Sequence, residues 1–172
     1  MDLLLPPATV LPDLLVPGLR IVFCGTAAGA ASAARGAYYA GRGNRFWPIL
    51  AETGLTPRLL SPEEFPLLPD FGIGLTDLAK HASGADADLA VDSFDRAGLI
   101  SRIQAVDPGV LAFNGKRAAA EFYGLPTARI AYGTAPPVAG LPPIFVLPST
   151  SRAANGNWDA GIWHAFAQRS LG

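Results

Sequence analysis

Short apolar runs recur along this chain, separated by more polar segments. Three of them, at residues 19–25, 109–115 and 144–151, are rich in Val, Ile, Leu and Phe and end in glycine or a polar loop. Such runs are typical of buried strands. A fourth stretch, residues 70–78, contains two glycines and fits a strand or an extended loop.

The segments between these runs carry helix signals. Residues 61–64, Ser-Pro-Glu-Glu, form a capping box with proline at the first helical position. The proline-rich stretch 132–143 is predicted to be a surface connection. Helices are predicted at residues 43–54, 91–108, 116–124 and 157–170. Strands that alternate with helices predict an α/β fold, in which helices cover both faces of a parallel sheet.

Composition narrows the class of protein. The 172 residues are 50% apolar with a net charge of −1, which suits one globular domain over residues 1–172. This charge argues against a strongly basic nucleic-acid coat, although it is compatible with a local basic patch. The single cysteine, Cys24, excludes an internal disulfide and an all-cysteine metal cluster. The apolar N-terminus lacks the features of a signal peptide and no apolar run could span a membrane, so we expect a soluble, cytoplasmic protein.

The ends of the predicted strands carry the candidate chemistry, because ligands of open α/β sheets bind where strands end. The four ends read CGTAAG, GIGLTD, AFNGK and LPSTSR. Each is a weak signal alone. The first lacks the spacing of a dinucleotide-binding loop, the third lacks that of a P-loop, and the fourth fits an ordinary serine-threonine turn.

Five motifs taken in order resemble one family. They are VFCGTAAG, YYAGRGNRFW, GIGLTDL, AFNGK and VLPSTSR, and the resemblance spans about residues 17–170. The chain looks like the mismatch-specific uracil and thymine DNA glycosylases, a branch of the uracil-DNA glycosylase superfamily. The resemblance implies a three-layer αβα fold with a central four-stranded parallel sheet. It also implies monofunctional hydrolysis of the N-glycosidic bond of a flipped deoxyuridine, without metal or cofactor.

Base excision explains the residue types in these motifs. The enzyme must extrude the nucleotide into a pocket that stacks on the base, and Tyr39 matches the stacking aromatic of the family. A tyrosine of the hydrophobic core is the alternative. Backbone amides around Gly25, Ala27 and Ala28 could bond the leaving base, whose negative charge grows as the bond breaks. Asn114, in the fourth motif, is a further candidate for substrate binding.

The first motif departs from the family pattern. The family usually has Gly-x-Asn-Pro-Gly there, with an asparagine that positions the attacking water. This chain has Ala27 and Ala28 at the asparagine and proline positions. A methyl group cannot hold water, so either the protein is inactive or another residue performs this role.

Asp77 is the first candidate for that role. The resemblance puts it on the opposite wall of the pocket, where a carboxylate could orient water and face the cationic sugar. A helix-capping or surface aspartate is the alternative. Thr26 and Thr76 could also hold water, and Asp88 and Asp92 are reserve candidates for the carboxylate.

Contact with DNA is predicted for residues 149–157, which match the wedge segment of the family. Ser149 and Ser151 could bind phosphate, Arg152 is the large side chain nearest the wedge position, and Lys116 is a further phosphate contact. The expected partner is uracil-containing DNA, double-stranded or single-stranded, bound by a monomer without a membrane. Two other functions stay open: a DNA-binding homologue that senses uracil or mismatches without cleaving, and a small-molecule nucleoside or nucleotide binder.

Overall fold

A five-stranded sheet forms the centre of the molecule. The structure is a computed structural model and describes residues 9–84, 89–90 and 93–172, so the reserve candidates Asp88 and Asp92 lie outside the described residues. The strand order is β2-β1-β3-β5-β4. The strands are β1 (Ile21–Ala28), β2 (Ile73–Ser83), β3 (Val110–Asn114), β4 (Gly133–Thr134) and β5 (Ile144–Leu147).

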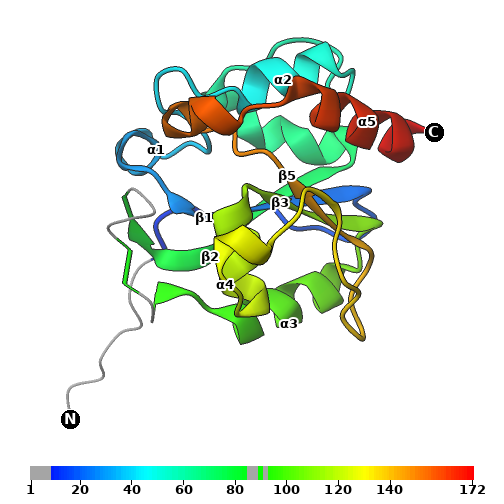
Figure 1. Ribbon diagram of the computed structural model, residues 1–172. Coiled ribbons are helices and arrows are strands. Elements are labelled where there is room, and N and C mark those ends of the chain that lie inside the picture. The colour runs from blue at the N-terminus through cyan, green and yellow to red at the C-terminus, as the bar shows by residue number, and fades with distance from the viewer. Residues whose placement is uncertain (1–8, 85–88, 91–92) are drawn as a thin grey trace.

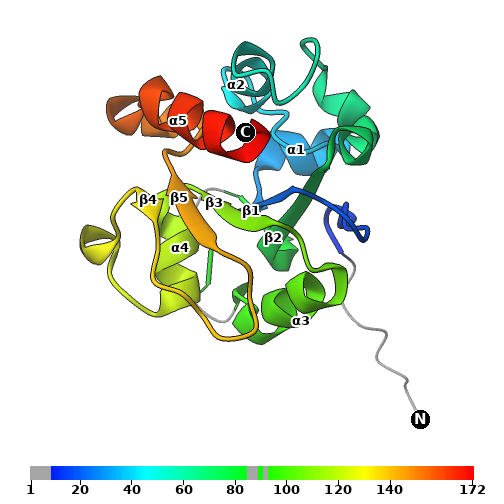
Figure 2. The ribbon, with the colours of Figure 1, turned by 90° about the vertical axis from the view of Figure 1, so that its right-hand side faces the viewer.

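Neighbouring strands are parallel except at one edge, where β4 runs antiparallel to β5. The predicted three-layer αβα architecture with four parallel strands is confirmed, and the short β4 is added within the proline-rich connection. Figure 2 shows α1, α2 and α5 on one face of the sheet and α3 and α4 on the other. The helices are α1 (Ala30–Arg35), α2 (Phe46–Glu52), α3 (Arg96–Val106), α4 (Lys116–Tyr123) and α5 (Ala160–Leu171), with 3₁₀ segments η1 (Pro62–Phe71), η4 (Thr127–Arg129) and η5 (Arg152–Asn157).

The central strand β1 holds both layers together, because successive side chains of a strand point to opposite faces. Phe23 packs in the cluster under α2 and α5, with its ring 5.4 Å from that of Phe46 in an edge-to-face arrangement. Cys24 packs in the other cluster, with Phe113 and Phe122. The side chain of Cys24 is fully buried.

Several elements differ from the sequence prediction in their bounds. Strand β1 continues through Ala28, beyond the end predicted at Gly25, because it stays paired with β2 as far as Ser83. Helix α3 begins at Arg96, since the carboxylate of Asp95 accepts a hydrogen bond from Gly98 N at 2.9 Å and caps it there. The capping box at Ser61 is present but opens a 3₁₀ segment, because internal prolines lack the N–H that an α-helix needs.

The chain before β1 covers the free edge of β2. Val10 N donates to Lys80 O at 2.8 Å, and Leu14 forms an antiparallel bridge with Leu75. Figure 2 shows this segment, in dark blue, beside β2 at the edge of the sheet opposite β4; Figure 1 shows the same elements turned by 90°. We call residues 10–14 the N-terminal strap. An unpaired strand edge invites pairing with other chains, and the strap closes this one. No helix within the described residues is long and apolar enough to cross a membrane.

Candidate active site

The predicted site residues gather at the carboxyl ends of the parallel strands. Gly25 on β1 is paired directly with Asp77 on β2, and Asn114 is the last residue of β3. The loop after β5 reaches Asn114 through Thr150. The topology therefore brings together residues that lie far apart in the sequence, at the edge where parallel sheets bind ligands.

Gly25 makes room for the side chains around it. A Cβ atom added at Gly25 would lie 2.8 Å from Asp77 Oδ1 and 3.3 Å from the Tyr39 hydroxyl. The first separation is shorter than real Cβ contacts, so any other residue would displace the carboxylate. Gly25, Asp77 and Tyr39 thus enclose one small space over the end of β1.

Asp77 is a buried carboxylic acid in a mixed electrostatic environment. Its side chain is 4% exposed. Burial raises the pKa of Asp77 to about 6; among the nearby charges, Lys80 and Arg102 favour ionisation and Asp13 opposes it. Asp77 is therefore mostly ionised at neutral pH. Because its pKa lies close to neutral pH, the ionised carboxylate can also take up a proton from water. Such an acid is suited to act as a base.

Tyr39 is held in an unusual backbone conformation. Its φ is +52°, in the left-handed region that residues with a side chain rarely adopt. One face of its ring is covered by Phe46, with ring centroids 4.1 Å apart and a tilt of 31°. Strain of this kind persists where surrounding contacts hold the residue, and it is common at functional sites.

The hydroxyl of Tyr39 is buried, and among the described residues it makes no hydrogen bond of normal geometry. Burial, and then the charge of Asp77, raise its pKa well above the ordinary value, while the neighbouring Asn114 side chain acts in the opposite direction. The approach to Asn114 is a weak polar contact outside hydrogen-bond geometry, and the amide of Asn114 is held by Thr150. The orphaned hydroxyl marks a place where a polar ligand or water would be stabilised.

Asn114 is fixed in one orientation by the loop after β5. Its Nδ2 donates to Thr150 Oγ1 at 2.9 Å, and its Oδ1 accepts from Thr150 N at 3.0 Å. Both residues are buried. Because the two bonds use both ends of the amide, the side chain cannot rotate without losing them.

Comparison with known proteins identifies the family. A model of the uracil DNA glycosylase superfamily matches residues 12–167, which is most of the chain. This chain belongs to the uracil DNA glycosylase superfamily. It is also similar to the solution NMR structure of a candidate uracil DNA glycosylase from Methanosarcina acetivorans. That match has a TM-score of 0.66 at 22% identity and covers 94% of this chain and 97% of that chain, which supports a shared fold.

The two alanines of the first motif, Ala27 and Ala28, lie on strand β1 itself. Ala27 is part of β1 and is paired with Ala79 of β2, while Ala28 is buried. Gly25 and Ala27 are two residues apart and share one face of β1. Asp77, paired with Gly25, therefore lies on the same face of the sheet as Ala27.

The two threonines proposed to hold water differ in their surroundings. Thr76 is fully buried, and its hydroxyl donates to Asp13 Oδ1 at 2.7 Å. Thr76 and Asp77 are adjacent on β2, so their side chains leave opposite faces of the strand. Thr26 lies on β1 beyond Gly25 and is half-buried. A role for either in holding water stays a prediction, and the Thr76 hydroxyl is already engaged.

The residues predicted to contact DNA follow strands β3 and β5, close in sequence to Asn114 and Thr150. Ser151 and Arg152 are exposed, whereas Ser149 and Lys116 are half-buried. The stem of Arg152 lies against Gly43, where an added Cβ would come within 3.0 Å of Arg152 Cδ. The ammonium of Lys116 sits 4.4 Å from the ring centroid of Tyr132. Their contacts with DNA stay predictions.

Other kinds of site are not apparent around the strand ends. No group of three or more metal-ligating side chains occurs in the part of the chain that the structure describes. Two surface cavities lie elsewhere: one of about 350 Å³ includes Arg20 and Arg169, and one of about 200 Å³ includes Tyr123 and Ile130. Neither is lined by Asp77, Tyr39 or Asn114.

Sequence reasoning missed three charged residues beside Asp77. Asp13, Lys80 and Arg102 form a partly buried cluster next to it, and they come from the strap, β2 and α3. A lysine at a predicted strand end, three residues after Asp77, was a possible signal. Nothing local marks Asp13 or Arg102, because their meeting depends on the tertiary fold.

Proposed function

We propose that this protein is a monofunctional DNA glycosylase that hydrolyses the N-glycosidic bond of deoxyuridine, with Asp77 as its catalytic carboxylate. We assign it to the mismatch-specific branch, whose motifs it resembles, with G:U pairs as the first substrate. One observation carries the proposal: the buried carboxylate of Asp77 lies over Gly25 and beside Tyr39, at the edge of the sheet where ligands bind.

The reaction needs a water molecule and a group that tolerates a cationic sugar. As the bond from C1′ to the base lengthens, the sugar becomes oxocarbenium-like, and an ionised carboxylate stabilises it. Asp77 would orient water and take one of its protons as the water oxygen bonds to C1′. The bond to the base breaks with its electron pair moving to uracil, which then gains a proton.

The leaving base also needs hydrogen-bond donors. Strand β1 pairs with β3 only as far as Cys24 but continues along β2 to Ala28. Backbone from Gly25 onward is therefore no longer in the ladder with β3, and we assign it to the polar edge of uracil. The base would stack on the face of the Tyr39 ring opposite Phe46. Ser149, Ser151, Arg152 and Lys116 would hold the backbone of the DNA and fill the gap left by the flipped base.

The test is a single-turnover assay on an oligonucleotide with one deoxyuridine opposite guanine, in the presence of a metal chelator. We expect free uracil and an abasic site, with strand breakage only after alkali or heat. Metal-dependent activity, or direct nicking in the enzyme reaction, would contradict the proposal. Paired A:U and single-stranded substrates in the same assay measure whether mismatched DNA is preferred.

A second candidate is a DNA-binding homologue that recognises uracil without cleaving it. The observation that favours it is Ala27, because the family's water-positioning amide is absent there. A gel-shift assay separates the two functions. Selective binding to uracil-containing duplex with no excision, in both wild type and Asp77→Asn, would establish the second candidate.

A further inference from the structure

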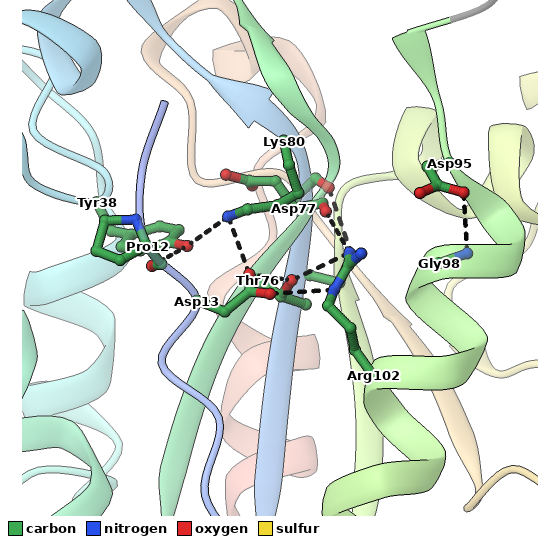
Figure 3. A network of polar contacts seen from close by, with 11 residues as sticks. Pro12, Asp13, Tyr38, Thr76, Asp77, Lys80, Asp95, Gly98 and Arg102 are labelled. Carbon is green, nitrogen blue, oxygen red and sulfur yellow. Dashed lines mark hydrogen bonds and ion pairs between the residues drawn. The ribbon is translucent and has the colours of Figure 1, made fainter. Parts of the chain in front are cut away.

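A cluster of charged side chains lies directly behind Asp77 (Figure 3). Asp13 of the N-terminal strap is at its centre. Its Oδ1 accepts a hydrogen bond from Thr76 Oγ1 at 2.7 Å and pairs with Lys80 Nζ at 2.9 Å. Its Oδ2 lies 3.1 Å from Arg102 Nε. One carboxylate thus contacts β2 twice and α3 once.

The two cations of this cluster are also tied to the site itself. Arg102 donates a hydrogen bond to the backbone carbonyl of Asp77 at 2.9 Å. Lys80 donates to the Tyr38 hydroxyl at 3.1 Å, and Tyr38 in turn donates to the carbonyl of Pro12 at 2.9 Å. The side chain of Lys80 is only 8% exposed. A buried ammonium is stable only when it is paired, so Lys80 depends on Asp13.

The charges around Asp77 come from several elements. Lys80 and Arg102 are positive and Asp13 is negative. The other titratable neighbours are a thiol and two phenols, which are neutral at ordinary pH, and burial raises the pKa of each further. Among the residues that the structure describes, those facing Asp77 are Lys80 on β2, Asp13 on the strap, Arg102 on α3, Cys24 on β1, and Tyr38 and Tyr39 after α1. Asp13 is therefore the one charge in this set that repels the Asp77 carboxylate.

We propose that Asp13 is a positioning residue of the excision reaction, which holds Lys80 and Arg102 in place and balances their charge so that Asp77 can act as a base near neutral pH. The inference rests on the proposed role of Asp77. It makes the N-terminal strap part of the active site as well as the cover of the β2 edge. Asp13 acts through the cations, and it is not itself assigned a contact with substrate.

The proposal predicts opposite effects for two substitutions. Asp13→Asn removes the repelling charge and leaves two cations uncompensated, so Asp77 stays ionised to lower pH. Lys80→Met removes an attracting charge, so Asp77 takes up its proton at higher pH. Each charge should move the Asp77 midpoint by about one pH unit, the size expected for charges several ångströms apart in a partly buried site.

The experiment measures the Asp77 midpoint in two ways on the full chain. Single-turnover excision is followed from pH 4.5 to 9, and the Asp77 carboxyl carbon is titrated by NMR over the same range. Wild type, Asp13→Asn and Lys80→Met are compared with Asp70→Asn, which removes an exposed negative charge at the opposite end of β2. We expect the midpoint to fall in Asp13→Asn, to rise in Lys80→Met and to stay unchanged in Asp70→Asn.

The outcomes separate this inference from the proposed function. Unchanged midpoints in both network variants, or shifts in the same direction, would overturn the inference even if excision is normal. If Asp13→Asn does not fold, the direction of the Lys80→Met shift alone decides. Opposite NMR shifts in a protein that does not excise uracil would overturn the proposed function, and with it any catalytic role for Asp13.

Discussion

The two sides of strand β2 make a useful comparison. On one side, Thr76 faces a polar cluster in which Asp13 contacts three partners. On the other side, Asp77 and Tyr39 face a small space over Gly25, and the Tyr39 hydroxyl lacks a hydrogen bond of normal geometry among the described residues. Buried polar groups are normally satisfied, so the exceptions point to where a ligand or water is expected. The polar side holds Asp77 through ion pairs and hydrogen bonds, although Arg102 Nε, 3.1 Å from Asp13 Oδ2, is itself outside hydrogen-bond geometry. The unsatisfied side, at the Tyr39 hydroxyl, is the one left for substrate.

The largest expected effect comes from removing the Asp77 carboxylate. Asp77→Ala should lower the single-turnover excision rate by about 10²–10⁴-fold, the range typical of a positioned acid or base, while DNA binding changes little. Asp77→Asn should keep part of the rate, because an amide can still hold water. In wild type the rate should fall as pH drops below about 6, where Asp77 gains its proton.

The melting temperature serves as the folding control for these variants. A well-folded Asp77→Ala protein with a near-normal rate would remove Asp77 from the mechanism. It would also make the contrast between the two sides of β2 a matter of packing alone. The reserve candidates Asp88 and Asp92 would then be the next carboxylates to replace.

A smaller loss is expected from filling the space over Gly25. The Cβ of Gly25→Ala would meet Asp77 Oδ1 at 2.8 Å and push the carboxylate from its position. We expect excision to fall by about 10²-fold, because small misplacements of a catalytic group are costly. Gly29→Ala is the matched control: it lies on the same segment, and nothing lies within 4 Å of an added Cβ there. Equal rates for the two variants would contradict the proposed geometry.

Much of the fold follows from sequence pattern, because its elements depend on local signals. Apolar runs locate the strands, and the capping box at Ser61 is formed as predicted. Local signals fail where pairing between strands sets the end of an element. Strand β1 extends beyond Gly25 to Ala28 because it stays paired with β2. Helix α3 starts later than its apolar pattern suggests, since Asp95 supplies the cap.

The site divides in the same way. The motif residues Gly25, Asp77 and Asn114 could be named from sequence, because parallel strands end at one edge of a sheet. The pairing of Asp13 with Thr76 could not, since 63 residues separate them and neither belongs to a recognisable charge pattern. The same holds for the left-handed backbone at Tyr39, which no local residue preference favours.

Tyr39 tests the unsatisfied side with a subtler change. Tyr39→Ala should weaken capture of the base by about 1–3 kcal/mol, the usual loss for one base–aromatic stack. Tyr39→Phe should keep most of that affinity, because the ring face does the stacking. It should also unfold at a somewhat higher temperature, since it removes a buried hydroxyl without a good partner. A phenylalanine variant as poor as the alanine one would make the hydroxyl, and not the ring, the working group.

Removing the Asp77 charge should also change the free energy of unfolding, by an amount similar to the loss of base capture, and this change shows what the active arrangement costs in stability. The pKa of Asp77 is about 6 in the folded protein, above the value of 3.8 for an ordinary aspartate. Between these values the folded state binds a proton that the unfolded state lacks, so this group destabilises the fold increasingly as pH rises. The penalty is complete above pH 6 and absent below about pH 4. Asp77→Asn should therefore be more stable than wild type by about 2–3 kcal/mol at pH 8, and the difference should vanish at pH 4. Denaturant unfolding at the two pH values measures this. A stability difference that does not depend on pH would mean that Asp77 is not held in the strained, charged state from which its reactivity is inferred.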